Sequence, residues 1–489
     1  MNGKLLLWLG WAGFDAVGRL FLLTVSTTVF SRLLLPIDFG LSALVFTTVT
    51  IASVLVGAPF EESLAQRRHI MRAHAETATA TALFVGTALF LLSFPLAAVL
   101  ARFYQEPLVL QLLPAAMASI FFTGYIDIST GLLRRQRKFN DLAIASLTGN
   151  LLGIGISVAM AVIGFGIWSL IAQRLMISGI TALVLAQRIG FIVPPKFSFA
   201  HFKDLRGYAG VSLADRLADN LNYFAFNNLV GAIYGLQALG YVNMAMRLIE
   251  PLRGAFTSTG HNLAFFYFAA VKTDKIKLRE RADEVLTRAA LVVAPVFVGL
   301  AAVMPVLLPL IAGPGWEPAV NIAICLGLGA AILLPARLIY TALSASARPE
   351  FSLGSNLANV AVTNTVLLLA SGLGPINVGL ARIAGDSIQS SIAVGLSPRH
   401  LDWSRWDRLQ ILLTAWLLSG FMGMAVIGFQ HALPQLPPLV SLLGSVGTGV
   451  VVYAGLCNVF ARTHFRSLVG LTGHNRKDAA PKIASTLNP

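Results

Sequence analysis

Charged residues lie inside long apolar runs of this sequence, where lipid is the expected surrounding. The stretch "GVSLADRLADNLNYFAFNNLVG", residues 210–231, carries Asp215, Arg216 and Asp219. A charge at the centre of a bilayer costs about 2.5 to 3.5 kcal/mol on insertion scales, so such groups need water or partners and should not face lipid. The question raised by these residues is therefore which partner or ligand they bind.

Helical spacing places several of these charges on shared faces. Asp215 and Asp219 are four residues apart, and Arg216 lies on the adjoining stripe. Farther along, Arg247 and Glu250 are three residues apart, with Arg253 close by. One interpretation is an interhelical lock between these two runs.

Two other charge pairs have the spacing of intrahelical ion pairs. Asp15 and Arg19 are four residues apart, as are Arg382 and Asp386. A structural role for both pairs is as plausible from spacing as a role in ion coupling. The residues that we assign to ion coupling or to structural pairs are Asp15, Asp215, Asp219, Glu250, Arg382 and Asp386.

Arginines outnumber carboxylates within the apolar runs, so pairing leaves positive charge over. The arginines are Arg19, Arg32, Arg174, Arg216, Arg247, Arg253, Arg288, Arg337 and Arg382. The acids are Asp15, Asp127, Asp215, Asp219, Glu250 and Asp386. Guanidinium groups bind phosphate and carboxylate oxygens in bidentate fashion, which predicts a water-filled, inward-opening cavity for an anionic substrate. The predicted cavity residues are Arg19, Arg174, Arg216, Arg247, Arg253 and Arg337.

The elements that must position these residues are membrane-spanning helices. The chain of 489 residues is 56% hydrophobic and only 12% charged, unlike a soluble domain. Apolar runs long enough to cross about 30 Å of hydrocarbon predict fourteen spans and an all-α polytopic membrane protein. The spans are 11–32, 40–60, 77–101, 108–133, 141–163, 166–187, 207–233, 237–260, 285–311, 319–343, 351–371, 375–396, 409–430 and 438–460.

Basic residues are concentrated in alternate connections between the predicted spans. Examples are "QRRHIMR" at 66–72, "RRQRK" at 134–138 and "KTDKIKLRER" at 272–281, whereas the opposite connections are short and nearly uncharged. By the positive-inside rule both termini are cytoplasmic. This topology also accounts for the net charge of +14, and since no soluble basic module is present we expect no nucleic-acid partner.

The spans divide into two predicted six-helix lobes around a central cavity. Shifting the chain by 200 residues places Asp15 over Asp215 and Gly40 over Gly240, a weak internal repeat of the kind that transporters show. The predicted divisions are an N-terminal lobe, a cytoplasmic linker, a C-terminal lobe, two further helices and a disordered cytoplasmic tail: 1–188, 189–206, 207–396, 397–460 and 461–489.

Other chemistry has little support in the sequence. There is no P-loop, no dinucleotide-binding glycine turn and no HExxH motif, so we expect no cofactor and no enzymatic activity. His69 and His74 lie in a basic connection and are more typical of solvated residues than of metal ligands, and the two cysteines lack metal-site spacing. A polymerase or membrane glycosyltransferase usually needs a sizeable outer loop, which the predicted topology lacks.

Three stretches resemble a known family of bacterial polysaccharide transporters. "RLLLPIDFG", residues 32–40, is similar to the Arg-x-Leu-x-Pro-x-Asp-Phe-Gly turn that joins its first two helices. "GLQALGYVNMAMRLIEPLRG" at 235–254 and "LLRRQRKFNDLAIASLTGN" at 132–150 resemble the start of its eighth helix and the loop before its fifth. The chain thus resembles, along nearly its whole length, the polysaccharide transporter branch of the multidrug/oligosaccharidyl-lipid/polysaccharide exporter superfamily.

This resemblance implies a function at the bacterial cytoplasmic membrane. The expected activity is translocation of undecaprenyl-diphosphate-linked oligosaccharide from the inner to the outer leaflet, for exopolysaccharide of the succinoglycan or colanic-acid type or for O-antigen. Expected partners are this lipid-linked substrate, membrane lipids, a polysaccharide polymerase and a chain-length regulator. The alternative is a multidrug or cation antiporter of the same fold, although its cavity should be acidic rather than rich in arginine.

Overall fold

The part of the chain that the structure describes is built from helices. The structure is a computed structural model that describes Gly18 and residues 21–66, 70–189, 194–269, 275–345, 350–401 and 405–460. Within those ranges no β-strand is present. The predicted tail, 461–489, lies outside the described residues.

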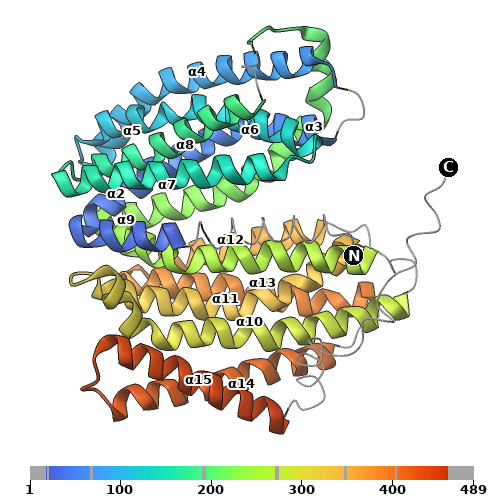
Figure 1. Ribbon diagram of the computed structural model, residues 1–489. Coiled ribbons are helices and arrows are strands. Elements are labelled where there is room, and N and C mark those ends of the chain that lie inside the picture. Colours follow the sequence, from blue (N-terminus) through green and yellow to red (C-terminus); the bar gives the residue numbers. More distant parts are fainter. Residues whose placement is uncertain are drawn as a thin grey trace. The chain divides into compact units, whose positions relative to one another are not determined.

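The described helices follow the predicted spans closely (Figure 1). After the helical segment 21–33 they are α2 (Pro36–Val56), α3 (Ala58–Gln66), α4 (Arg72–Tyr104), α5 (Val109–Met117), α6 (Ser119–Arg135), α7 (Phe139–Ile163), α8 (Trp168–Ile189), α9 (Phe199–Ala269), α10 (Lys275–Ala312), α11 (Glu317–Ala345), α12 (Glu350–Leu369), the 3₁₀ turn η1 (Ser371–Leu373), α13 (Ile376–Leu401), α14 (Arg405–Ala432) and α15 (Pro438–Phe460).

Ten stretches of the described helices are long and apolar enough to cross a membrane. One of them, Asn220–Thr257, contains parts of two predicted spans, because α9 is interrupted only at Gly235. Three predicted spans have no counterpart among these ten stretches. Span 11–32 is described only in part, and spans 351–371 and 375–396 correspond to α12 and α13. The prediction of an all-α polytopic membrane protein is confirmed, and the number fourteen is approximate.

The chain forms two compact units, each with its own interior. Unit 1 comprises Met1–Pro251, Ile311–Ile322 and Asn364–Val378, and unit 2 comprises Leu252–Leu310, Ala323–Thr363 and Gly379–Pro489. These units are groups of residues in mutual contact. The predicted lobes, 1–188 and 207–396, stay a prediction.

The break in α9 allows a very close helix crossing within unit 1. Gly235 has φ 83° and ψ 170°, a conformation that glycine adopts without a steric penalty. Beyond it, a Cβ built on Gly240 would overlap the carbonyl oxygen of Pro36, and a Cβ built on Gly40 would overlap that of Leu236. The two contacts are related by the same shift of 200 residues that aligns the sequence repeat, so the crossing is locally two-fold.

Two turns of the second half of the chain are built into unit 1. Trp316, in the turn between α10 and α11, is 1% exposed and donates from Nε1 to the carbonyl oxygen of Ser31 at 3.0 Å. Its ring meets Phe39 edge to face, with centroids 4.9 Å apart. Asn377, at the start of α13, donates to the hydroxyl of Tyr234 at 2.9 Å.

Unit 2 has an apolar core to which α14 and α15 are attached by polar contacts. The Tyr453 hydroxyl on α15 donates to the carbonyl oxygen of Leu291 at 2.7 Å, and the Trp416 indole on α14 donates to that of Ala331 at 3.0 Å. Gln430 on α14 donates to the carbonyl oxygen of Ala302 at 3.2 Å. The last two helices are therefore fixed to α10 and α11.

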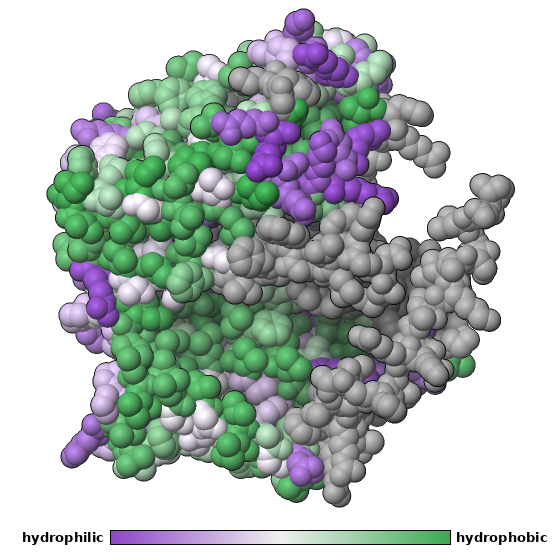
Figure 2. All heavy atoms as spheres, viewed as in Figure 1, coloured by the Kyte–Doolittle hydropathy of each residue, from purple (hydrophilic) through white to green (hydrophobic). Residues whose placement is uncertain are grey.

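Apolar side chains cover much of the described surface on the face that Figure 2 shows. Most of α2 is buried, whereas only a small part of α4 and of α15 is buried, although all three are strongly apolar. Exposed examples are Phe84, Leu91 and Val99 on α4 and Val451 on α15. Such an apolar surface is stable against lipid and not against water.

Candidate functional site

Several predicted site residues belong to parts of the chain that are not placed. Asp15 and Arg19 lie outside the described residues, and for Asp215, Arg216 and Asp219 the backbone belongs to α9 while the side chains are not described. Their predicted roles stay predictions. The candidate site is therefore built from the remaining arginines.

Arg247 lies on α9 and contacts only neutral groups in the described structure. Its Nε donates to Oδ1 of Asn243, one helical turn earlier, at 3.1 Å. Its guanidinium carbon is 5.0 Å from the centroid of the Phe39 ring on α2. A cation over the face of an aromatic ring is attracted by the ring quadrupole and keeps its full charge.

Arg174, on α8, has a similar environment. Its Nε donates to the hydroxyl of Ser119 at 3.3 Å, and its guanidinium carbon is 5.4 Å from the centroid of the Phe46 ring. The preceding residue, Gln173, donates to the hydroxyl of Ser26 at 2.7 Å, which fixes this part of α8 against the helical segment 21–33. Arg174 is thus also held by a hydroxyl and a ring rather than by an acid.

The two rings that carry these arginines lie on one face of α2. Phe39 and Phe46 are seven residues apart, which is two helical turns, or about 10 Å along the axis. Helices α8 and α9 thereby bring two guanidinium groups to the same buried helix. We call Arg174 and Arg247 the α2 arginine pair.

Arg253 has a different kind of partner. It belongs to unit 2, is 7% exposed, and its Nη2 lies 3.3 Å from Oδ1 of Asp386 on α13, itself 1% exposed. The same carboxylate oxygen accepts a hydrogen bond at 3.1 Å from Nδ2 of Asn359 on α12. The charge of Arg253 is therefore compensated inside the protein.

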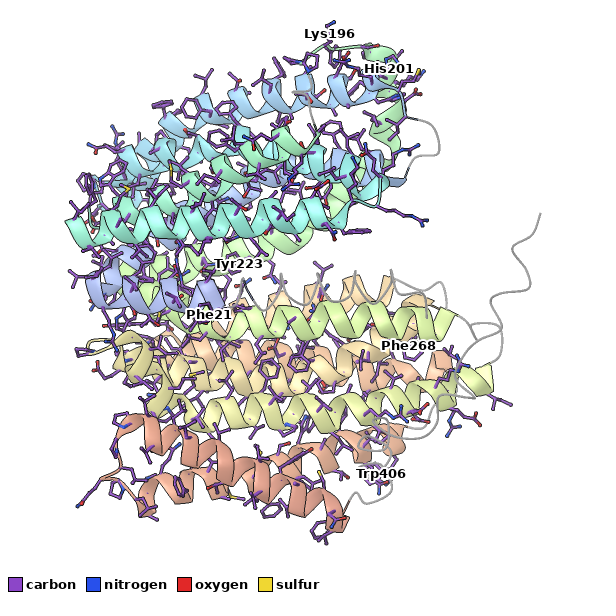
Figure 3. All side chains as sticks on the ribbon, viewed as in Figure 1. Phe21, Lys196, His201, Tyr223, Phe268 and Trp406 are labelled. Carbon is purple, nitrogen blue, oxygen red and sulfur yellow. The ribbon has the colours of Figure 1, made fainter. Side chains whose placement is uncertain are left out.

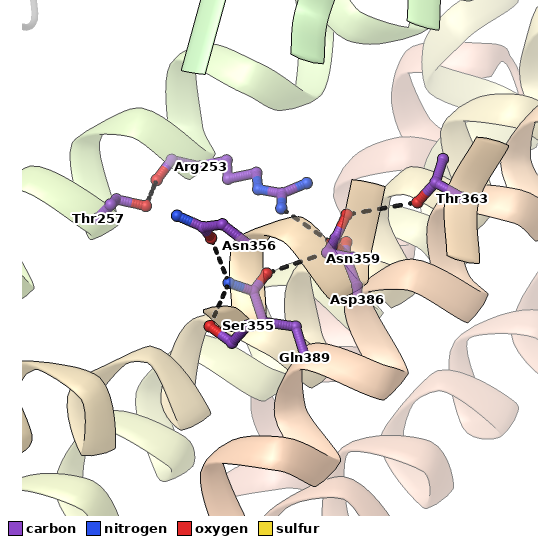
Figure 4. A network of polar contacts seen from close by, with 8 residues as sticks. All are labelled: Arg253, Thr257, Ser355, Asn356, Asn359, Thr363, Asp386 and Gln389. Carbon is purple, nitrogen blue, oxygen red and sulfur yellow. Dashed lines mark hydrogen bonds and ion pairs between the residues drawn. The ribbon is translucent and has the colours of Figure 1, made fainter. Parts of the chain in front are cut away.

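Amide side chains extend this ion pair into a network (Figure 4). Asn359 also donates to Oε1 of Gln389 at 3.1 Å, and Gln389 donates to Asn356 and, at 3.4 Å, to Ser355. The backbone carbonyl of Gln389 accepts the Tyr340 hydroxyl of α11 at 2.7 Å. The network thus joins α9, α11, α12 and α13 within unit 2.

The remaining predicted residues lie near this network or elsewhere on the same helices. Arg382 is one turn before Asp386 on α13 and interacts with it electrostatically. Arg337 is partly buried on α11, and its carbonyl oxygen accepts the Thr341 hydroxyl at 3.3 Å. Glu250 is partly buried on α9.

Sequence reasoning did not find the partners of these arginines. The carboxylate bound by Arg253 is 133 residues away, so spacing along one helix gave no signal for it. The polar stripe of Asn356, Asn359 and Thr363 on α12 does have helical spacing and was a usable signal. For the α2 arginine pair, the usable signal was the seven-residue spacing of Phe39 and Phe46, which places both rings on one face of α2.

Metal binding has no support in the described residues. Among them, no three His, Cys, Asp or Glu side chains are grouped so as to hold an ion. The prediction that His74 is solvated is wrong, because it lies on α4 and is 3% exposed. Its ring contacts that of His201, and its Nε2 lies 3.5 Å from Oδ2 of Asp204.

The fold is that of known flippases and multidrug transporters. The structure superposes on a lipid II flippase MurJ in an inward closed conformation with a TM-score of 0.74, at 16% identity, over 95% of this chain and 100% of that one. An inward-facing multidrug resistance transporter of the MATE family gives a TM-score of 0.59 at 15% identity, over 81% and 98% of the two chains. These likenesses establish the fold.

Two curated relatives come from polysaccharide biosynthesis. The chain is 26% identical over 340 residues to the succinoglycan biosynthesis transport protein ExoT of Rhizobium meliloti, covering 67% of this chain and 66% of ExoT. It is 26% identical over 279 residues to the teichuronic acid biosynthesis protein TuaB of Bacillus subtilis, covering 55% of this chain and 56% of TuaB. The matches span less than two thirds of either relative.

A family model matches the region that holds most of unit 1. The match runs over residues 29–321, more than half of the chain, and includes Arg174, Arg247 and both phenylalanines of α2. It also includes the "RLLLPIDFG" turn and the Gly40–Gly240 crossing. The chain therefore belongs to the polysaccharide biosynthesis protein family described by that model.

Proposed function

We propose that this protein moves a polyprenyl-diphosphate-linked oligosaccharide from the inner to the outer leaflet of the bacterial cytoplasmic membrane. Family membership, a succinoglycan transport protein among the relatives and a lipid II flippase fold support this activity. The substrate is amphipathic, with a long apolar tail and a charged diphosphate, so a membrane protein with partly buried cations suits its chemistry.

The observation that carries the proposal is the α2 arginine pair. Arg174 and Arg247 have no carboxylate partner among the described residues, and their contacts are a hydroxyl, an amide and two aromatic rings. Uncompensated cations inside a membrane protein are costly, and their presence favours an anionic ligand. A diphosphate accepts several charge-assisted hydrogen bonds from guanidinium groups.

The mechanism we propose is alternating access of two lobes around a cationic cavity. The diphosphate binds the α2 arginine pair with Arg19 and Arg216. The polyprenyl tail stays in lipid, and the lobes then rock to release the sugar outward. An inside-negative membrane potential favours outward movement of a negative charge by about 2.3 kcal/mol per 100 mV, so ATP is not required.

The same proposal fixes the orientation and the setting of the protein. Both termini are cytoplasmic, since the basic connections then lie inside. The chain itself catalyses no covalent reaction, and a polymerase and a chain-length regulator use the flipped product. A multidrug antiporter of the same fold is disfavoured, because the family match and both relatives belong to polysaccharide biosynthesis.

The test is a flipping assay with purified protein in proteoliposomes. A fluorescent lipid-linked oligosaccharide is incorporated, and its exposure on each leaflet is followed with a membrane-impermeant quencher. We expect Arg247→Ala and Arg174→Ala to lose most activity and the Lys variants to retain part of it. Arg102→Ala is the control, because Arg102 is an exposed residue in the last turn of α4. Wild-type activity in both Ala variants would contradict the proposal.

A further inference from the structure

The segment 194–205, which includes the first residues of α9, is held against the start of α4 in unit 1. The Thr77 hydroxyl lies 3.4 Å from the carbonyl oxygen of Lys196, and Nε2 of His74 lies 3.5 Å from Asp204. The rings of His74 and His201 meet edge to face with centroids 4.6 Å apart. Lys196 and His201 are seen together at this end of α4 in Figure 3. The segment 194–205 is therefore fixed in one orientation.

This orientation directs aromatic and basic side chains away from the protein. Phe197 and Phe199 are 58% and 70% exposed, and Lys196 and Lys203 are exposed as well. Leu205, on the inner side, is 1% exposed. The segment thus has one face bound to the protein and one face that combines phenylalanine with lysine.

The turn between α6 and α7 presents the same combination at the same end of unit 1. Arg137 and Lys138 are exposed there, followed by Phe139, which is 42% exposed. Since α4, α5 with α6, α7 and α8 alternate in direction, the start of α4, this turn and the end of α8 share one end. Figure 2 shows hydrophilic surface gathered at that end.

Several basic residues at this end already have acidic partners. Arg134 pairs with Glu61 at 2.8 Å, and Arg188 lies 3.5 Å from Asp141. In contrast, among the described residues no ion pair involves Arg137, Lys138, Lys196 or Lys203. We call these four residues with Phe139, Phe197 and Phe199 the basic aromatic collar.

The length of α4 favours a position of the collar at the level of lipid headgroups. Helix α4 has 33 residues and is about 50 Å long, which exceeds the roughly 30 Å of the hydrocarbon core, so its first turns reach the headgroup region. The collar segment is attached to those turns. Phe139 begins a membrane-spanning helix directly. Aromatic rings and basic groups together are typical of surfaces that enter the interface of an anionic membrane.

We propose that the basic aromatic collar binds the headgroups of anionic phospholipids in the leaflet that surrounds this end of unit 1. The phenylalanine rings insert at the boundary between headgroups and acyl chains, and the four basic groups contact lipid phosphates. A lipid is favoured over a soluble acidic partner because the charges alternate with exposed apolar rings beside membrane-spanning helices. This binding is separate from the proposed transport and does not depend on it.

The test measures lipid selectivity in bilayers. Full-length protein is reconstituted with spin-labelled phosphatidylglycerol or phosphatidylcholine, and the motionally restricted fraction of each is measured by electron paramagnetic resonance. We expect wild type to prefer phosphatidylglycerol, and each basic residue changed to Gln to reduce that preference, up to about fivefold per charge at low salt. The preference should fall as salt is raised.

Matched variants separate charge from folding. The triple variant Lys138→Arg, Lys196→Arg and Lys203→Arg keeps every charge and should keep the selectivity, and Phe197→Ser with Phe199→Ser should reduce binding of both lipids. Arg102→Gln, at the opposite end of α4, should change nothing. Equal binding of the two lipids by wild type, or unchanged selectivity in the Lys196→Gln and Lys203→Gln variant, would overturn the proposal.

Discussion

The two units surround their arginines in opposite ways, with a partly buried pair in unit 1 and a buried residue in unit 2. In unit 1, Arg247 and Arg174 are held by Asn243, Ser119 and aromatic rings, none of which cancels their charge. In unit 2, Arg253 is bound to the buried carboxylate of Asp386. Both arrangements fix a guanidinium group in place, but only the first leaves its charge for a ligand.

The difference between neutral and carboxylate partners indicates which arginines of a membrane protein suit substrate binding. A buried ion pair is strongly destabilised when one partner is removed, because the other charge stays uncompensated. An arginine on neutral partners has no such dependence, and its removal relieves an electrostatic cost. Breaking the ion pair of unit 2 should therefore lower stability, whereas removing an arginine of unit 1 should lower transport.

The largest effect is expected from breaking the pair in unit 2. Asp386→Ala leaves Arg253 buried without its carboxylate and should lower the free energy of unfolding by about 3 to 5 kcal/mol. Thermal unfolding in detergent measures this. The double variant Arg253→Met with Asp386→Leu should recover most of the loss, whereas equal destabilisation of both variants would show that the charge balance is unimportant there.

Removal of a unit 1 arginine should affect transport and spare the fold. Arg247→Ala deletes a charge-assisted contact worth about 1.5 to 3 kcal/mol, which corresponds to a fall of roughly 10- to 100-fold in apparent substrate affinity. The unfolding temperature should stay close to that of wild type. A variant that unfolds as easily as Asp386→Ala would place Arg247 in the same structural class as Arg253.

The comparison can also be tested by converting one site into the other. Asn243→Asp has nearly the same shape and places a carboxylate where Oδ1 now accepts from Arg247 at 3.1 Å. We expect weaker binding of lipid-linked diphosphate, by about tenfold, because the new acid neutralises the arginine. Stability should be unchanged or higher. Asn243→Gln is the uncharged control, and weakened binding in that variant alone would contradict this interpretation.

The smallest effect is expected from the aromatic ring under Arg174. Phe46→Leu removes a cation–π contact of about 0.5 to 2 kcal/mol and keeps an apolar side chain on α2. Substrate affinity should fall a few-fold, and less in the Phe46→Tyr variant. An additional loss in the double variant Phe46→Leu with Arg174→Ala, beyond that of Arg174→Ala alone, would show that the ring acts independently of the arginine.

Sequence reasoning predicted the helices better than the contacts between them. Apolar length predicted most of the spans, but α12 and α13 are not among the ten apolar stretches of the described residues. Both carry polar side chains of one buried network: Asn356, Asn359, Asp386 and Gln389. Single-helix spacing related Arg382 to Asp386, and only the fold could bring Arg253 to the same carboxylate. Long-range pairing of this kind depends on helix packing, which periodicity does not encode.

The crossing of α2 and α9 restricts how this sequence can change over generations. A methyl group at Gly40 would meet the main chain at Leu236, and one at Gly240 would meet the main chain at Pro36. Because each obstacle is backbone, no replacement of the opposing residue could make room for it. Each of the two helices consequently requires its own glycine, and a change in one helix cannot relieve the other of that requirement.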